Sequence, residues 1–167
     1  MDNNHDYNNL LTKWKNADMV HIHKEALLTH SAHQVFIVIT DIPSYPLFLD
    51  WCDKAKIDEK PSESVVYATL GINFHGIKQS FQTQNTMITD QSVELSLLHG
   101  PFSKLHGMWL LSPIEGHSSK GCMVSFDIEY EFSNTMLEKI IGASFKHITN
   151  SIVDSFVKRI NDVYRES

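Results

Sequence analysis

The chain has 167 residues, a net charge of −6 and a hydrophobic fraction of 42%, values typical of one globular domain. The acidic balance argues against a broad nucleic-acid-binding surface and against DNA as a partner. No apolar run reaches the roughly 20 residues that span a bilayer, and the polar start, Met1 to Leu10, is unlike a secretory signal. We therefore expect a cytoplasmic protein.

The N-terminal region divides into an extension and the start of a domain. Residues 1–18 are polar and predict a flexible extension, whereas residues 19–167 predict a single domain. Within that domain, Met19 to Leu28 has the apolar spacing of a strand.

A short helix is expected after this strand. Ser31 and Gln34 have the spacing of a capping box, in which each side chain bonds the backbone N–H of the other residue. The helix must end before Pro43, because proline disfavours helix in the residue that precedes it. Tyr45 to Leu49 is apolar but too proline-rich for a strand, which favours a helical turn.

From Lys54 to Phe132 the hydrophobic pattern has the period of two that is typical of strands. Turn signals at His75-Gly76 and Gly100-Pro101 separate successive strands. The last strand is the clearest, since every second residue from Cys122 to Phe132 is apolar. The pattern predicts an antiparallel meander with one solvated face.

After Phe132 the apolar spacing changes to three and four, which predicts one amphipathic helix of about 30 residues. Thr135 and Glu138 have capping-box spacing, so we expect the helix to begin there. Such a helix is not stable alone, and its apolar stripe must lie on the sheet. The sequence therefore predicts an α+β fold, in which a long C-terminal helix lies on a curved antiparallel sheet and leaves an apolar pocket where the two do not fill the space.

The cysteines and histidines do not have the spacing of a structural zinc site. Without an export signal, Cys52 and Cys122 are expected to be free thiols that pack as small apolar residues. His21 and His23 share one face of the first strand and would hold zinc only with a third ligand from elsewhere. We therefore expect a solvated strand face and no metal.

Three segments resemble motifs of the coenzyme Q-binding, START-like family of the polyketide cyclase/dehydrase superfamily. Ser44 to Cys52 resembles Y-P-x-F-L-P-W-C, Gly100 to Trp109 resembles G-P-F-x-x-L-x-G-x-W, and Phe126 to Phe132 resembles the F-x-L-x-F-x-F strand. The terminal helix is also similar to the family pattern at Phe145, Val153, Phe156, Arg159, Val163 and Tyr164. The resemblance runs from about Val20 to Tyr164 and is nearer in style to the bacterial ribosome-association toxin branch.

The resemblance implies the helix-grip fold of START-like and Bet v 1-like proteins, with a curved sheet wrapped around a long helix. It also implies a carrier or chaperone that supports respiration by binding ubiquinone, or a similar isoprenoid lipid, without chemistry and without a redox cofactor. Such a protein would make peripheral contact with the inner membrane.

Candidate ligand-binding residues are the inward apolar positions of the strands and helix and the aromatic segment near one end. They are Tyr45, Phe48, Leu49, Trp51, Leu70, Ile72, Phe74, Phe81, Leu95, Leu97, Trp109, Val124, Phe126, Ile128, Ile141, Phe145, Ile148 and Ile152. Each buried methylene of an isoprenoid tail contributes about 0.8 kcal/mol, so a tail of modest length binds without polar contacts. Tyr67, Tyr130 or His106 could orient a quinone ring.

The resemblance leaves two alternatives. The first is a toxin of a type II toxin–antitoxin pair that binds the large ribosomal subunit and blocks subunit joining, for which an acidic chain favours contact with basic ribosomal proteins over rRNA. The second is a polyketide cyclase/dehydrase-like enzyme. Asp127, Glu129 and Glu131 are the conspicuous carboxylates, but their phase places them on the solvated face. We therefore expect no catalytic residue among them.

Overall fold

The computed structural model describes residues 19–114 and 121–165. Its elements in chain order are β1 (Val20–Leu28), α2 (Ala32–Thr40), the 3-10 helix η1 (Ile42–Leu47), β2 (Cys52–Ser62), β3 (Val65–Phe74), β4 (Ile77–Ile88), β5 (Ser92–His99), β6 (Phe102–Ile114), β7 (Gly121–Phe132) and α3 (Thr135–Val163). The predicted extension, residues 1–18, lies outside the described residues. None of the described helices is long and apolar enough to span a membrane.

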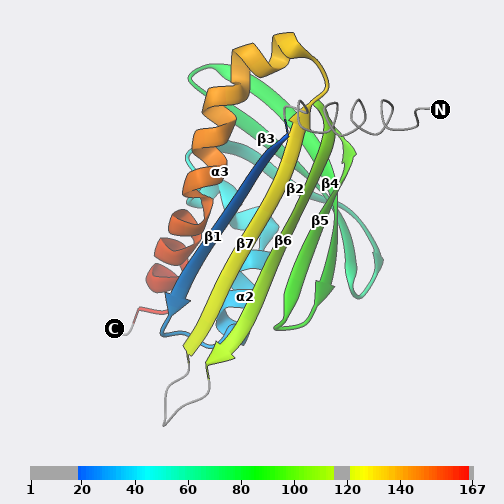
Figure 1. Ribbon diagram of the computed structural model, residues 1–167. Coiled ribbons are helices and arrows are strands. Elements are labelled where there is room, and N and C mark those ends of the chain that lie inside the picture. Colours follow the sequence, from blue (N-terminus) through cyan, green and yellow to red (C-terminus); the bar gives the residue numbers. More distant parts are fainter. Residues whose placement is uncertain (1–18, 115–120, 166–167) are drawn as a thin grey trace, which may run out of the picture.

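The strands form one antiparallel sheet of seven strands in the order β1-β7-β6-β5-β4-β3-β2. Strands β2 to β7 therefore pair with their neighbours in the chain, and β1 is added to the β7 edge. Figure 1 shows α3 running along one face of the sheet, with α2 on the same side. The predicted α+β helix-grip arrangement and antiparallel meander are confirmed.

The turn between β3 and β4 explains why these strands pair without a bulge. His75 has a φ of 52° and Gly76 a φ of 83°, as a two-residue type I′ hairpin turn requires. Glycine adopts this conformation without steric cost. Phe74 then pairs directly with Ile77, and the inward phase of β3 passes unbroken into β4.

The core lies between the inner face of the sheet and α3. The even-numbered residues of β7 from Cys122 to Phe132 are all buried, as the alternation predicted. On α3, Ile141, Phe145, Ile148, Thr149, Val153, Phe156 and Ile160 are buried. These residues recur every three or four positions, so one stripe of the helix contacts the sheet.

The capping prediction for α2 is confirmed, because Ser31 and Gln34 bond one another's backbone N–H at 3.1 and 3.0 Å. The capping prediction for α3 is wrong. The N-cap is Asn134, whose side chain accepts from the Leu137 backbone N–H at 2.8 Å. An N-cap residue needs extended backbone, which Asn134 has, whereas Thr135 is already the first helical residue.

Strand β2 was not identified as a separate strand from the sequence. Its first residue, Cys52, is buried, and nearly all of the ten residues that follow are exposed. Strand β2 therefore has no alternation of buried and exposed positions. It is an edge strand that carries charged residues and Pro61. Such residues discourage pairing of an edge with another chain. Because β2 lies at an exposed edge of the sheet, its sequence lacks the alternation of apolar and polar residues by which strands are recognised.

We predict that Asn134→Ala lowers the free energy of unfolding by about 1 kcal/mol, because the Leu137 N–H loses its acceptor at the start of α3. Urea unfolding followed by circular dichroism measures this change. The matched control is Thr135→Ala, which we expect to change stability by less than about 0.5 kcal/mol. Equal losses in the two variants would contradict the assignment of Asn134 as N-cap.

Candidate functional site

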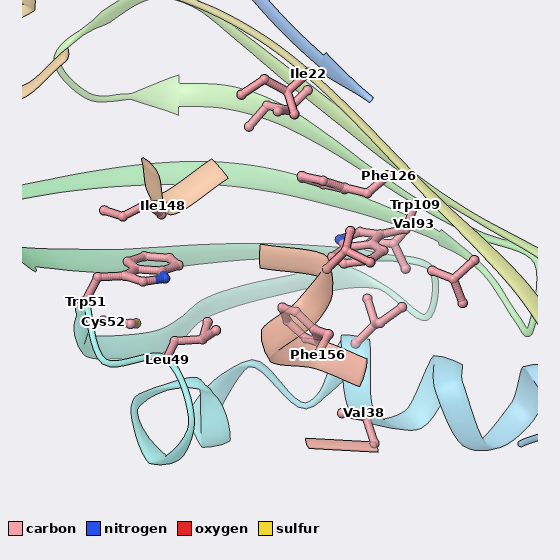
Figure 2. Close-up of a cluster of buried hydrophobic side chains, with 14 of the residues drawn as sticks. Ile22, Val38, Leu49, Trp51, Cys52, Val93, Trp109, Phe126, Ile148 and Phe156 are labelled. Atoms are coloured by element: carbon pink, nitrogen blue, oxygen red, sulfur yellow. The ribbon is translucent and has the colours of Figure 1, made fainter. Parts of the chain in front are cut away.

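An apolar cavity of about 60 Å³ lies between the sheet and α3. Side chains from α3, from the segment after α2 and from the inner faces of β3 to β7 line it. They are Ile42, Tyr45, Leu49, Trp51, Ala68, Leu70, Phe81, Thr83, Asn85, Leu95, Leu105, Trp109, Phe126, Ile128, Phe145, Ile148, Thr149, Ile152 and Phe156. Figure 2 shows part of this buried cluster, with Trp51, Trp109 and Phe126 among its labelled members.

Most of the residues predicted to bind a ligand line this cavity: Tyr45, Leu49, Trp51, Leu70, Phe81, Leu95, Trp109, Phe126, Ile128, Phe145, Ile148 and Ile152. Ile72, Phe74 and Ile141 instead line a second, smaller space of about 10 Å³. Phe145 and Ile148 border both spaces. These two side chains of α3 therefore form the partition between them.

The remaining predicted residues, Phe48, Leu97 and Val124, face neither space. Val124 is 2% exposed and belongs to the packed core. Phe48 packs with its ring centroid 5.0 Å from that of Phe156, and the Arg159 guanidinium lies 5.4 Å from the Phe48 ring centroid. The aromatic segment therefore contributes to one end of the site through Tyr45, Leu49 and Trp51 rather than through Phe48.

The sequence reasoning missed several lining residues, which include the polar residues Thr83, Asn85 and Thr149. All three are at most 4% exposed. Thr83 and Asn85 continue the inward phase of Phe81 along β4, so the strand period contained the signal. The prediction for the inward positions names only apolar side chains and therefore does not include these two.

The buried polar groups of the cavity are mostly bonded to each other or to the backbone. Asn85 Nδ2 donates to Thr83 Oγ1 at 3.1 Å and to the Val66 carbonyl at 3.3 Å. The Thr149 hydroxyl donates to carbonyls of its own helix. The Tyr45 hydroxyl donates to the Ile39 carbonyl. Trp51 Nε1 differs from these groups, because it has no acceptor among the described residues.

Among the described residues, no carboxylate, imidazole, amine, guanidinium or thiol lines the cavity. Tyr45 is its titratable group, and burial raises the pKa of its hydroxyl above the ordinary value of 10.0. General acid–base catalysis needs a positioned group whose pKa lies near the working pH. The lining of the cavity therefore suits binding of an apolar molecule better than proton transfer to it.

The three residues proposed to orient a quinone ring do not line the cavity. His106 lies on the outer face, with Nε2 3.1 Å from Glu94 Oε1. Tyr67 alternates with the buried Val66 and Ala68 and so points outward. Tyr130 does point inward and is 1% exposed, but aromatic rings surround it. The structure therefore does not bring these three side chains to the cavity, because strand phase places Tyr67 and His106 on the outer face and aromatic rings enclose Tyr130.

Most of the charged pairs among the described residues lie on the outer face of β1, β5, β6 and β7. We call Glu25, Glu94, Asp127, Glu129 and Glu131 the acidic outer face. His23 Nδ1 lies 2.8 Å from Asp127 Oδ1, and Lys104 Nζ lies 3.0 Å from Glu129 Oε2. The expectation that the carboxylates of β7 point to solvent is confirmed. They lie across the sheet from the cavity and cannot act on its contents.

Cys52 and Cys122 are free and buried, as expected. Burial raises the pKa of the Cys52 thiol to about 11 and also raises the pKa of Cys122. Both thiols are therefore protonated at neutral pH and poor nucleophiles. The described residues hold no cluster of His, Cys, Asp or Glu suited to a metal ion.

A family model and individual relatives indicate the same family for this chain. The polyketide cyclase / dehydrase and lipid transport family matches residues 28–157. The ribosome association toxin RatA of Pseudomonas aeruginosa is 31% identical over 86% of this chain and 97% of its own length. The mitochondrial coenzyme Q-binding protein COQ10 homolog B of Xenopus laevis is 20% identical over 93% of this chain and 64% of its own.

Solved structures agree on the fold. The crystal structure of the Zhui aromatase/cyclase from Streptomyces sp. R1128 has a TM-score of 0.75 and covers 88% of this chain and 97% of that one. Its sequence identity of 11% makes it evidence for the fold alone.

We predict that the pKa of His23 lies above the ordinary value of 6.5, because Asp127 first and Glu25 second accept hydrogen bonds from its protonated ring. The contribution of this contact to stability is then present below pH 6.5 and is lost as the pH rises through the folded-state pKa. Titration of the imidazole protons by NMR measures the shift. Asp127→Asn should lower the His23 pKa towards 6.5, whereas Glu94→Gln should not change it.

Proposed function

Because the chain belongs to the polyketide cyclase / dehydrase and lipid transport family, we propose that it acts within that family as a ribosome-association factor. The supporting observation is the match to RatA of Pseudomonas aeruginosa, which extends over 97% of that protein. The match to the coenzyme Q-binding relative is weaker and covers less of the relative. By resemblance, the bound target is the large ribosomal subunit and the consequence is a block of subunit joining.

Charge favours the acidic outer face as the contact surface. With a net charge of −6, the protein is repelled by rRNA phosphates as a whole, because affinity for nucleic acid comes largely from neutralising phosphates with Lys and Arg. A basic ribosomal protein would meet the acidic outer face with complementary charge. Exposed apolar residues lie on the same face, among them Leu27, Leu110 and Met123, which are 65%, 45% and 36% exposed.

The fold also creates one modest basic site. Lys24 of β1 and Lys146 of α3 lie far apart in the sequence but line one surface groove together with Asn150. This groove is the competing surface for a phosphate contact. Its two lysines therefore provide a matched comparison for the acidic outer face.

We predict that the protein lowers the fraction of joined ribosomes when it is overproduced, which sucrose-gradient profiles measure. The double variant Asp127→Lys with Glu129→Lys should bind large subunits at least about tenfold more weakly in co-sedimentation, because like charges across an interface cost several kcal/mol. The control is Lys24→Glu with Lys146→Glu, which should retain binding.

Unchanged monosome levels would remove the ribosome role. If only the Lys24→Glu, Lys146→Glu variant loses binding, the contact is instead with rRNA at the groove.

The apolar cavity supports a second role, which is compatible with the first. We propose that it binds a hydrophobic isoprenoid of the ubiquinone class without chemistry, as a carrier would. The volume of about 60 Å³ is below the roughly 150 Å³ of an engineered protein cavity that binds benzene. A quinone ring therefore enters only if side chains move, and the partition formed by Phe145 and Ile148 is the place where movement would join the two spaces.

We predict that Phe145→Ala joins these spaces and binds decylubiquinone several-fold more tightly than the unchanged protein. Its free energy of unfolding should fall by about 3–5 kcal/mol, the usual cost of removing a buried phenyl ring. Fluorescence titration and urea unfolding measure the two effects.

The control is Phe102→Ala, since Phe102 is equally buried but borders neither space. It should lose stability without gaining affinity. The carrier role fails if native mass spectrometry finds no hydrophobic ligand on the purified protein and added quinone leaves its melting temperature unchanged.

A further inference from the structure

The indole N–H of Trp51 is a buried donor without a partner. Trp51 is 7% exposed, and its Nε1 has no hydrogen-bond acceptor among the described residues. The indole nitrogen donates and does not accept, and buried donors in native proteins are rarely left unpaired. Trp51 also lines the apolar cavity. The unpaired donor therefore belongs to a residue that a bound molecule would touch.

The backbone holds Trp51 firmly in this position. Its carbonyl accepts from the Asn73 N–H at 2.7 Å, and the next residue, Cys52, donates from its N–H to the Leu49 carbonyl at 2.9 Å. Figure 2 shows Trp51 in the same buried cluster as Leu49, Ile148 and Phe156. These two backbone bonds fix the position from which the indole reaches the cavity.

Other polar side chains that line the cavity already donate within the protein. Asn85 uses its amide donors on Thr83 and the Val66 carbonyl, and Thr149 uses its hydroxyl on its own helix. A buried water usually needs two to four polar partners. An oxygen carried by an apolar molecule needs only the one donor, because the remaining lining supplies apolar contact.

We propose that Trp51 Nε1 donates a hydrogen bond to a carbonyl oxygen of an apolar ligand held in the cavity. This inference rests on the proposed cavity role and adds to it the chemical class of the ligand. A quinone carbonyl and the ester carbonyl of an acyl lipid share this chemistry. A plain hydrocarbon chain does not.

The experiment compares three probes of similar chain length: decylubiquinone, methyl laurate and dodecane. Each is titrated into the full chain and into Trp51→Phe. Loss of one hydrogen bond should weaken binding of the two carbonyl probes about tenfold, while the affinity for dodecane stays within about twofold. The smaller phenyl ring of Trp51→Phe also enlarges the cavity, which affects all three probes. Dividing the affinity for each carbonyl probe by the affinity for dodecane removes that shared effect.

A second measurement does not depend on the stability of the variant. The chain has three tryptophans, so its indole N–H protons give at most three NMR signals, and the signal missing in Trp51→Phe is that of Trp51. In the unchanged protein this signal should move downfield with either carbonyl probe and stay in place with dodecane. The carbonyl probe that binds more tightly identifies the source of the oxygen.

The matched control is Tyr130→Phe. Tyr130 carries the other buried polar atom without a partner among the described residues, but it does not line the cavity. This variant should leave the affinities for all three probes unchanged.

The inference is overturned if Trp51→Phe weakens all three probes equally or none, or if the Trp51 signal does not respond to the carbonyl probes. If the unchanged protein binds none of the three, the cavity role itself fails, and the inference fails with it.

Discussion

The structure depends on the contact between the apolar stripe of α3 and the inner face of the sheet. A helix of 29 residues cannot remain folded in water through local hydrogen bonds alone, and its stability comes from burying one face. The sheet has the same requirement on its inner side, where β7 alone presents six buried residues. Each element therefore needs the other, and removing α3 would expose the part of the inner face that α3 covers.

The same contact explains why the interior is nearly, but not completely, filled. A helix and a twisted sheet differ in shape, so side chains of graded size must fill the space between them. Aromatic rings fill most of it, with Trp109 and Phe126 only 4.4 Å apart between ring centroids. About 60 Å³ remains beside Trp51 and Asn85. The cavity is thus a consequence of the helix-grip arrangement rather than of one residue.

The sheet also separates two kinds of chemistry. Its inner face presents apolar and neutral polar groups, whereas its outer face presents carboxylates paired with His23, His106 and Lys104. A ligand in the cavity and a protein on the outer face would meet different residues of the same strands. The two proposed roles therefore do not compete for a surface, and variants on one face test one role with little disturbance of the other.

Much of the fold followed from the sequence, because the period of an apolar pattern depends on local geometry. The spacing within residues 122–132 predicted which side chains of β7 are buried, and Ser31 with Gln34 predicted the start of α2. The apolar pattern did not predict β2, because nearly all of that strand is exposed. The helix cap was assigned to the wrong residue where two neighbours, Asn134 and Thr135, can both cap a helix. Strand phase likewise placed most of the cavity lining.

What the sequence determined by itself was the side of the sheet or helix on which each residue lies. Only the tertiary structure decided which inward residues face empty space and which face one another, as the different positions of Trp51 and Val124 illustrate. It also decided that the Trp51 N–H has no partner among the described residues and that Lys24 and Lys146 line one groove. These properties depend on the distances between segments that are far apart in the sequence. The spacing of apolar residues within one segment carries no information about those distances.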